Sequence, residues 1–255
     1  MSNNRPSYFG WCMQICNFLN SSSNRGSGAQ IGEDGRPREI YAPKEVGMEE
    51  LWKDQISTGI NFSKYDNINV KVDGENKPRP IETFQSAGLA PVLLENILRA
   101  KYSTPTPVQK HGLPIIMARR DLMACAQTGS GKTAAFLFPI LHRILETRAE
   151  SWQGAATQAP QAIIITPTRE LAIQIFDEAR KFSAGSNVRT AILYGGTSTQ
   201  FQRGQLARGA NILVATPGKG GRFMQTRTLI GPEVQLSKSC PIRMSCKTNK
   251  NALIG

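Results

Sequence analysis

The chain has 255 residues, of which 40% are hydrophobic, and a formal net charge of +12. This length allows one large domain or two small ones. It contains no run of about 20 apolar residues that could span a bilayer, so we expect a soluble, intracellular protein. Five irregularly spaced cysteines and two distant histidines exclude a recognisable zinc motif and favour a reducing compartment.

The excess of positive charge is unevenly distributed. Residues 1–80 carry ten Lys/Arg and ten Asp/Glu, residues 81–219 carry fifteen and eight, and residues 220–255 carry six and one. The surplus therefore lies in the apolar centre and the tail. Such a balance suggests an acidic partner, of which nucleic acid is the commonest, although a well-solvated basic surface gives the same count.

The first 80 residues are predicted to lack a core. Residues 1–40 are rich in Ser, Asn, Gly and Arg, which predicts a disordered N-terminal arm. Residues 41–80 are predicted to be an extended lead-in with a short strand at Ile68–Val72, and regular structure is expected from Ile81.

Strand and helix patterns then alternate. Helical spacing predicts helices over residues 89–100, 107–117, 132–145, 169–182 and 199–207. Apolar runs predict strands at 121–126, with Cys125 as a buried side chain, and at 162–166, 188–194 and 212–215. Fully apolar strands that alternate with helices predict an α/β fold, a parallel sheet with helices on both faces. Ligands in such folds bind at the carboxyl ends of the strands.

A glycine-rich turn joins the first predicted core strand to its helix: Ala126-Gln127-Thr128-Gly129-Ser130-Gly131-Lys132-Thr133. Such a turn can point several backbone N–H groups inward as an anion nest, and the helix that follows adds positive potential. Lys132 can reach the outer phosphates and the Thr133 hydroxyl can bind Mg²⁺. A purely structural turn is the alternative, but Gly-Lys-Thr at the start of a helix favours nucleotide binding.

Residues upstream suggest which base is bound. The Gln109 carboxamide can both donate and accept, as the edge of adenine requires. Tyr102 could stack on that base and Phe84 could wedge the segment against the domain, although both aromatics also suit the core.

Together these segments resemble the DEAD-box RNA helicases. Phe84, Tyr102 and residues 105–109 resemble the Q motif of that family, residues 126–133 its motif I, Pro167-Thr168-Arg169-Glu170-Leu171-Ala172 its motif Ia, Gly195-Gly196 its GG motif, and Thr216-Pro217-Gly218 its motif Ib. Residues 59–66 and 179–183 resemble the Vasa-like branch. The resemblance implies the first, RecA-like helicase domain, with a Q motif at 81–110 and a partial ATP-binding domain at 111–219.

The family's use of these motifs implies two sets of contacts. ATP with Mg²⁺ would bind Phe84, Tyr102, Gln109 and residues 126–133. The backbone of single-stranded RNA would bind Pro167, Thr168, Arg169, Gly195, Gly196, Thr216, Pro217 and Gly218, without sequence preference. Gly195-Gly196 and Pro217-Gly218, taken alone, could be ordinary turns. The resemblance further implies a cytoplasmic protein, with ribonucleoprotein granules as one location and helicase cofactors as partners.

The chain departs from the family after motif Ib. No Asp-Glu-Ala-Asp sequence occurs in it; Asp177-Glu178-Ala179-Arg180 lies within a predicted helix, and Lys219 stands where the family usually has Arg. Residues 220–255 are predicted to be a basic tail outside the family, which suggests an altered 3′ end. In the family, the strands that follow motif Ib belong inside the sheet. Because this sequence lacks them, we expect an uncovered sheet edge and marginal stability. Three readings stay open: a truncated, inactive helicase, a non-catalytic RNA- or nucleotide-binding regulator, and a chain that forms no stable protein.

Overall fold

The computed structural model describes residues 46–53, 70–151, 160–196, 202, 204–206 and 208–217. The predictions for the arm at 1–40, for the tail at 220–255 and for Gly218 lie outside these residues. The helices are α2 (Met48–Lys53), the short 3-10 helix η2 (Gln85–Ala87), α3 (Pro91–Arg99), α4 (Pro107–Met117), α5 (Lys132–Ser151) and α6 (Arg169–Phe182). The strands are β1 (Ala162–Ile165), β2 (Thr190–Leu193) and β3 (Ile212–Ala215).

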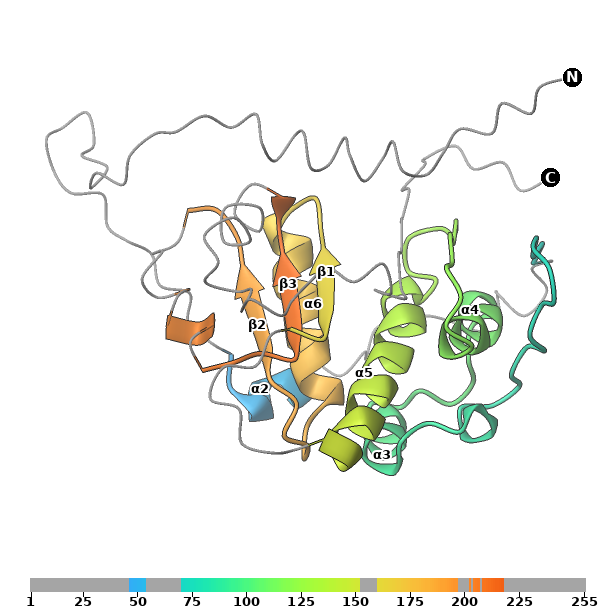
Figure 1. Ribbon diagram of the computed structural model, residues 1–255, viewed down its shortest axis with the longest axis horizontal. Coiled ribbons are helices and arrows are strands. Elements are labelled where there is room, and N and C mark those ends of the chain that lie inside the picture. The colour runs from blue at the N-terminus through green and yellow to red at the C-terminus, as the bar shows by residue number, and fades with distance from the viewer. Residues whose placement is uncertain are drawn as a thin grey trace, which may run out of the picture.

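The three strands form one parallel sheet in the order β1-β3-β2 (Figure 1). Ala162 pairs with Ile212 on one side of β3, and Thr190 pairs with the same residue on the other side. All three strands therefore end at one edge of the sheet, and α5 and α6 both begin at that end of the molecule. This confirms the predicted parallel α/β fold.

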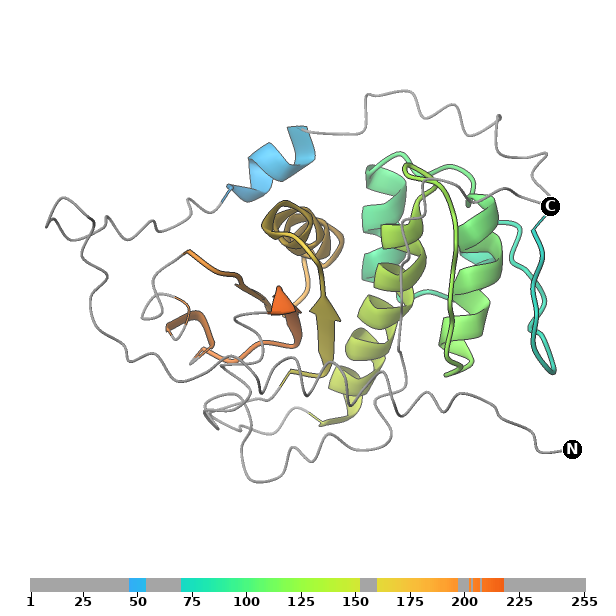
Figure 2. The same ribbon diagram turned by 90° about the horizontal axis from the view of Figure 1, so that it is seen from above.

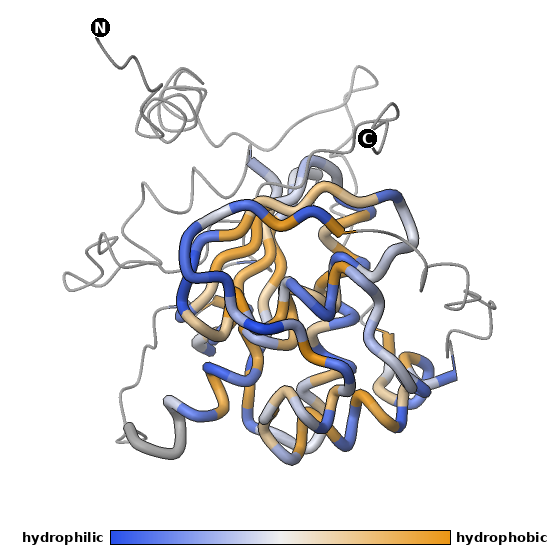
Figure 3. The backbone as a smooth tube through the Cα atoms, turned by 90° about the vertical axis from the view of Figure 1, so that its right-hand side faces the viewer, coloured by the Kyte–Doolittle hydropathy of each residue, from blue (hydrophilic) through white to orange (hydrophobic). Residues whose placement is uncertain are grey.

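Each face of the sheet packs against its own apolar cluster. Ile164, Ile192, Ile212 and Val214 belong to the main core, which α3, α5 and α6 complete. Their neighbours Ala191, Leu193, Leu213 and Ala215 point to the other face, where Leu206 and Ala210 cover them. Side chains alternate between faces along a strand, so continuous apolar runs are what a sheet covered on both sides requires. In Figure 3 the strands stand out as hydrophobic stretches inside the fold.

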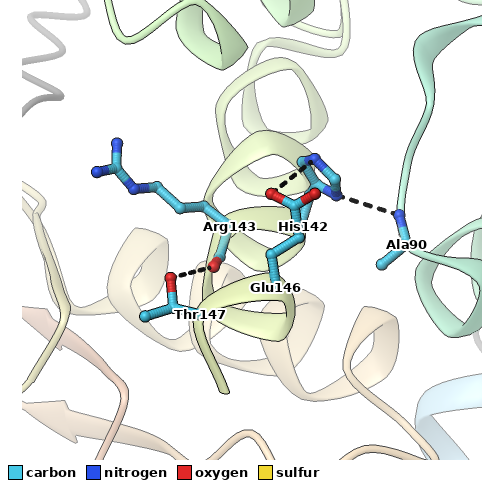
Figure 4. Close-up of polar contacts among 5 residues, drawn as sticks. All are labelled: Ala90, His142, Arg143, Glu146 and Thr147. Atoms are coloured by element: carbon cyan, nitrogen blue, oxygen red, sulfur yellow. Dashed lines mark hydrogen bonds and ion pairs between the residues drawn. The ribbon is translucent and has the colours of Figure 1, made fainter. Parts of the chain in front are cut away.

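A buried histidine joins the start of α3 to α5 (Figure 4). The backbone N–H of Ala90, which caps α3, donates to Nδ1 of His142 at 3.2 Å. The other ring nitrogen lies 3.4 Å from a carboxylate oxygen of Glu146, one helical turn further along α5. Because Nδ1 accepts a hydrogen bond, the ring is held as the tautomer with its proton on Nε2.

One predicted strand does not form, and the described part of another is irregular. Residues 121–126 were expected to be the first core strand, but only Leu122 makes an isolated bridge, and Met123 is 64% exposed. A strand needs a neighbour, and β1, the nearest strand of the described sheet in sequence, pairs only with β3. For the same reason Cys125, predicted to be buried, is exposed. The described part of the predicted strand at 68–72 is likewise irregular.

The lead-in contains a helix that the sequence analysis missed. The six residues of α2 interrupt the segment predicted to be extended, and Leu51 and Trp52 are buried. Figure 2 shows α2 on the outer side of α6. The helix is anchored by tertiary contacts, because an isolated helix of this length is unstable in water.

Candidate nucleotide and RNA site

The glycine-rich loop leads directly into α5. Gly129 and Gly131 have φ angles of 80° and 81°, a conformation that favours glycine. Thr128, Gly129 and Gln127 are exposed, whereas Ser130 is buried and its Oγ has no hydrogen-bond partner among the described residues. The first backbone N–H groups of α5 have no partner inside the helix, so they are free to bind an anion.

Lys132 folds back over the loop that precedes it. Its Nζ donates hydrogen bonds to the backbone carbonyls of Ala126 and Gln127. An ammonium held by two carbonyls is ready to exchange them for phosphate oxygens, which carry full negative charge. Thr133, the next residue of α5, is partly buried in the first turn of the helix.

Gln109 is fully buried and tied to the same loop. Its Oε1 accepts from the backbone N–H of Thr106 at 2.9 Å, and its Nε2 donates to the carbonyl of Gly131 at 3.1 Å. The Thr106 hydroxyl donates to the carbonyl of Ser130 at 2.8 Å. The start of α4 therefore holds the end of the glycine-rich loop through two side chains.

Thr106 is a site residue that the sequence analysis overlooked. With Gln109 it forms a capping box at the start of α4, and Pro107 occupies the first helical position. The signal is present in the sequence as Thr-Pro-Val-Gln, since Ser or Thr followed three residues later by Glu or Gln marks a helix start.

The two aromatic candidates lie in the core. Phe84 is fully buried and Tyr102 is 8% exposed. They form an edge-to-face cluster with Phe138 and Phe182, with ring centroids 4.8–6.1 Å apart. Burial, and then the negative charge of Glu178, raise the pKa of the Tyr102 hydroxyl, which stays protonated. Both residues pack in the main core against α5 and α6, as the core alternative in the sequence analysis anticipated.

A second set of residues gathers where the three strands end. Thr168 caps α6 by accepting the backbone N–H of Leu171, and Arg169 begins that helix. The Arg169 guanidinium extends over the turn after β2: an added Cβ at Gly196 would lie 2.8–3.0 Å from it, and one at Gly195 would lie 3.7 Å away. The predicted motifs Ia and GG are therefore in contact.

Thr216 directly follows β3, the strand that lies between β1 and β2. It is buried, and its backbone N–H donates to the carbonyl of Leu193 at 2.9 Å. Pro217 is half-buried beside it, whereas Pro167, Thr168 and Arg169 are exposed. The exposed hydrogen-bond donors at the carboxyl ends of the strands therefore come chiefly from the first turn of α6.

The acidic run at residues 177–180 lies in the middle of α6, as predicted, and does not follow a strand. Burial raises the pKa of the Glu178 carboxyl, and the charge of Lys181 opposes that shift only in part. Burial likewise raises the pKa of Asp177, which lies 3.6 Å from Arg180. Both residues are half-buried on α6.

Comparison with known proteins identifies the family to which these site residues belong. Residues 106–237 match the DEAD/DEAH box helicase family, a match that extends beyond residue 219 into the segment predicted to lie outside the family. The chain belongs to this family. It is 50% identical over 186 residues to the ATP-dependent RNA helicase vasa of Drosophila melanogaster, covering 72% of this chain and 28% of that protein.

Other relatives agree with this assignment. The human probable ATP-dependent RNA helicase DDX4 is 47% identical over 204 residues, which cover 78% of this chain and 28% of that protein. A solved structure of the RNA helicase Prp28 from Chaetomium thermophilum bound to ADP matches with a TM-score of 0.59 and 34% identity, over 79% of this chain and 45% of that one. The chain thus spans less than a third of the length of these curated relatives. No helix in the described part of the chain is long and apolar enough to cross a membrane.

Proposed function

We propose that this chain binds ATP with Mg²⁺ and the backbone of single-stranded RNA, and that it does not hydrolyse ATP by itself. The observation that carries the proposal is the position of Arg169 over the Gly195-Gly196 turn, at the same end of the molecule as the loop of Lys132. A cation, the backbone N–H groups of a glycine turn and those of a helix start can all bind the phosphates of a nucleic-acid backbone.

The glycine-rich loop suits a nucleotide triphosphate. The positive φ angles at Gly129 and Gly131, the free N–H groups of α5 and the unpartnered Ser130 hydroxyl all offer donors to phosphate oxygens. Lys132 would leave its two carbonyls to contact the outer phosphates, and Thr133 would offer its hydroxyl to Mg²⁺. When bound, the metal would neutralise phosphate charge.

The base would lie against the Q-motif segment. Gln109 would have to give up one of its two internal hydrogen bonds to contact adenine, so adenine binding and the Gln109–Gly131 bond compete. Tyr102 and Phe84 would support the adenine pocket with their buried rings.

RNA would be held without reading its sequence. Arg169 is a side-chain donor, and Gly195, Gly196 and the start of α6 offer backbone donors to phosphates, while Pro167, Thr168, Thr216, Pro217 and Gly218 complete the predicted contact set. None of these groups recognises a base edge.

Hydrolysis needs a carboxylate that positions the metal and the attacking water. The family's Asp-Glu-Ala-Asp motif does not occur in these 255 residues, and the similar run at 177–180 lies within α6 and follows no strand. A second candidate function is a non-catalytic regulator that competes with a longer relative for RNA, nucleotide or helicase cofactors. We place it in the cytoplasm, including ribonucleoprotein granules, where such competition could occur.

Two variants test the proposal. Binding of a fluorescein-labelled oligo-uridine is measured by anisotropy and binding of Mg-ADP by calorimetry. Lys132→Ala should abolish Mg-ADP binding and keep RNA binding, whereas Arg169→Ala should weaken RNA binding by about five- to fiftyfold, as expected for loss of a charge-assisted hydrogen bond. RNA-stimulated ATP hydrolysis that Lys132→Ala abolishes would contradict the claim of inactivity.

A further inference from the structure

Trp52 occupies a site built by two other helices. It is 9% exposed, although it belongs to a helix of only six residues. The Arg99 guanidinium, in the last turn of α3, lies 4.1 Å from the centre of the indole ring. The Lys181 ammonium, in the last turn of α6, lies 5.4 Å from the same ring.

Lys181 explains why an aromatic ring is needed there. It is only 8% exposed, and a buried ammonium is unfavourable unless a negative or polarisable group compensates for it. The indole face supplies such an environment through a cation–π interaction, for which Trp is the best side chain. Glu178, one turn earlier on α6, is close enough for the two charges to interact.

The same end of α6 is also fixed by α3. The Asn96 side chain donates to the carbonyls of Phe182 and Ala184, at 3.0 and 2.8 Å, where α6 ends. Trp52 bridges α3 and α6 beside this cap. Because α6 is a rigid rod of 14 residues, roughly 20 Å long, the position of its last turn also affects its first turn, which carries Arg169.

We infer that Trp52 is a positioning residue for RNA binding: by clamping the last turn of α6 against α3, it holds Arg169 over the Gly195-Gly196 turn. Little movement is tolerated there, since a single Cβ added at Gly196 would already lie 2.8–3.0 Å from the guanidinium. The inference rests on the proposed RNA function, but its structural part can be tested without RNA.

The experiment compares variants of the full chain. Trp52→Leu keeps an apolar side chain without the aromatic face, Trp52→Phe restores an aromatic face, and Lys53→Ala changes an exposed neighbour on α2. For each variant the Kd for labelled oligo-uridine, the Kd for Mg-ADP and hydrogen exchange over residues 169–175 are measured. Should Trp52→Leu fail to fold, Arg99→Gln removes one cation from an exposed position and carries the same prediction with a smaller effect.

We expect Trp52→Leu to raise the RNA Kd about three- to tenfold, within the range of coupling for residues that do not contact the ligand, and to speed exchange over residues 169–175. Trp52→Phe should recover most of the loss, while Mg-ADP binding and Lys53→Ala stay at wild-type values. Loss of thermal stability with unchanged RNA affinity and exchange would overturn the inference. If the wild-type chain binds no RNA, the proposed function fails, and the exchange data alone decide whether Trp52 positions the start of α6.

Discussion

Gly131→Ala and Gly129→Ala form a matched pair that tests the connection between Gln109 and the glycine-rich loop. Both glycines have φ near 80°, so alanine at either position should cost about 1–2 kcal/mol of backbone strain. At Gly129 the added Cβ meets nothing within 4 Å. At Gly131 it would lie 3.2 Å from the Gln109 Cδ and still closer to Nε2, so the buried carboxamide must move.

The difference between the two variants measures that displacement. Gln109 would lose its bond to the Gly131 carbonyl, and a buried amide without a partner costs about 1–3 kcal/mol. We therefore expect the free energy of unfolding to fall about 1–3 kcal/mol further in Gly131→Ala than in Gly129→Ala. Urea denaturation followed by circular dichroism gives both values.

A double-mutant cycle identifies the cause. In a Gln109→Ala background the added methyl group has room, so the excess destabilisation of Gly131→Ala should largely disappear. Equal destabilisation by the two single alanine substitutions, or an excess that persists without Gln109, would refute the proposed contact.

Three further predictions concern charge and close approach. Glu178→Gln should stabilise the fold at pH 7 and lose this advantage as the pH falls below the usual glutamate pKa of 4.5. Burial raises the pKa of Glu178 in the folded state. The contribution of Glu178 to stability is therefore complete below the unfolded-state pKa and is lost as the pH rises through the folded-state pKa. Thermal melts from pH 3.5 to 8 measure this, and a constant difference across that range would count against it. Gly196→Ala should weaken oligo-uridine binding more than Gly195→Ala, because only the former crowds Arg169 closely, and equal affinities would argue that Arg169 is not the contact. Asn96→Ala should lower the free energy of unfolding by about 2–4 kcal/mol, because two carbonyls at the end of α6 lose their donor; a loss under 0.5 kcal/mol in urea denaturation would show that water replaces the amide.

Much of the fold could be predicted from local pattern. The helices at 107–117 and 169–182 were predicted from helical spacing, the first also from the proline that opens it. In the structure both follow a capping threonine, Thr106 and Thr168. The strands at 162–166 and 212–215 were predicted within a residue, since continuous apolar runs are typical of parallel sheets.

The failures concern residues whose state depends on distant neighbours. Residues 121–126 have strand composition but no pairing partner among the described strands, so Met123 and Cys125 are exposed. Ile165 is the last residue of β1, an outer strand of the described sheet, and is 56% exposed. Trp52 lies in a polar lead-in, and its burial depends on distant residues of the main core, with the cations of Arg99 and Lys181, 47 and 129 residues away in sequence, near its ring.

The candidate site was predictable in its parts but not in its connections. The sequence identified Lys132, Gln109 and Arg169 by type and spacing. It did not indicate that Gln109 bonds to the Gly131 carbonyl, or that Arg169 lies over Gly196, because both contacts join segments that are more than 20 residues apart.

The most direct test of the account is a thermal melt of the purified chain with and without Mg-ADP. A native glycine-rich loop binds the nucleotide only when folded, so the account predicts one cooperative transition that Mg-ADP moves upward by several degrees, and no movement in Lys132→Ala. A melt without a cooperative transition, or a transition that Mg-ADP leaves unchanged, would contradict the claim that these 255 residues form a nucleotide-binding domain.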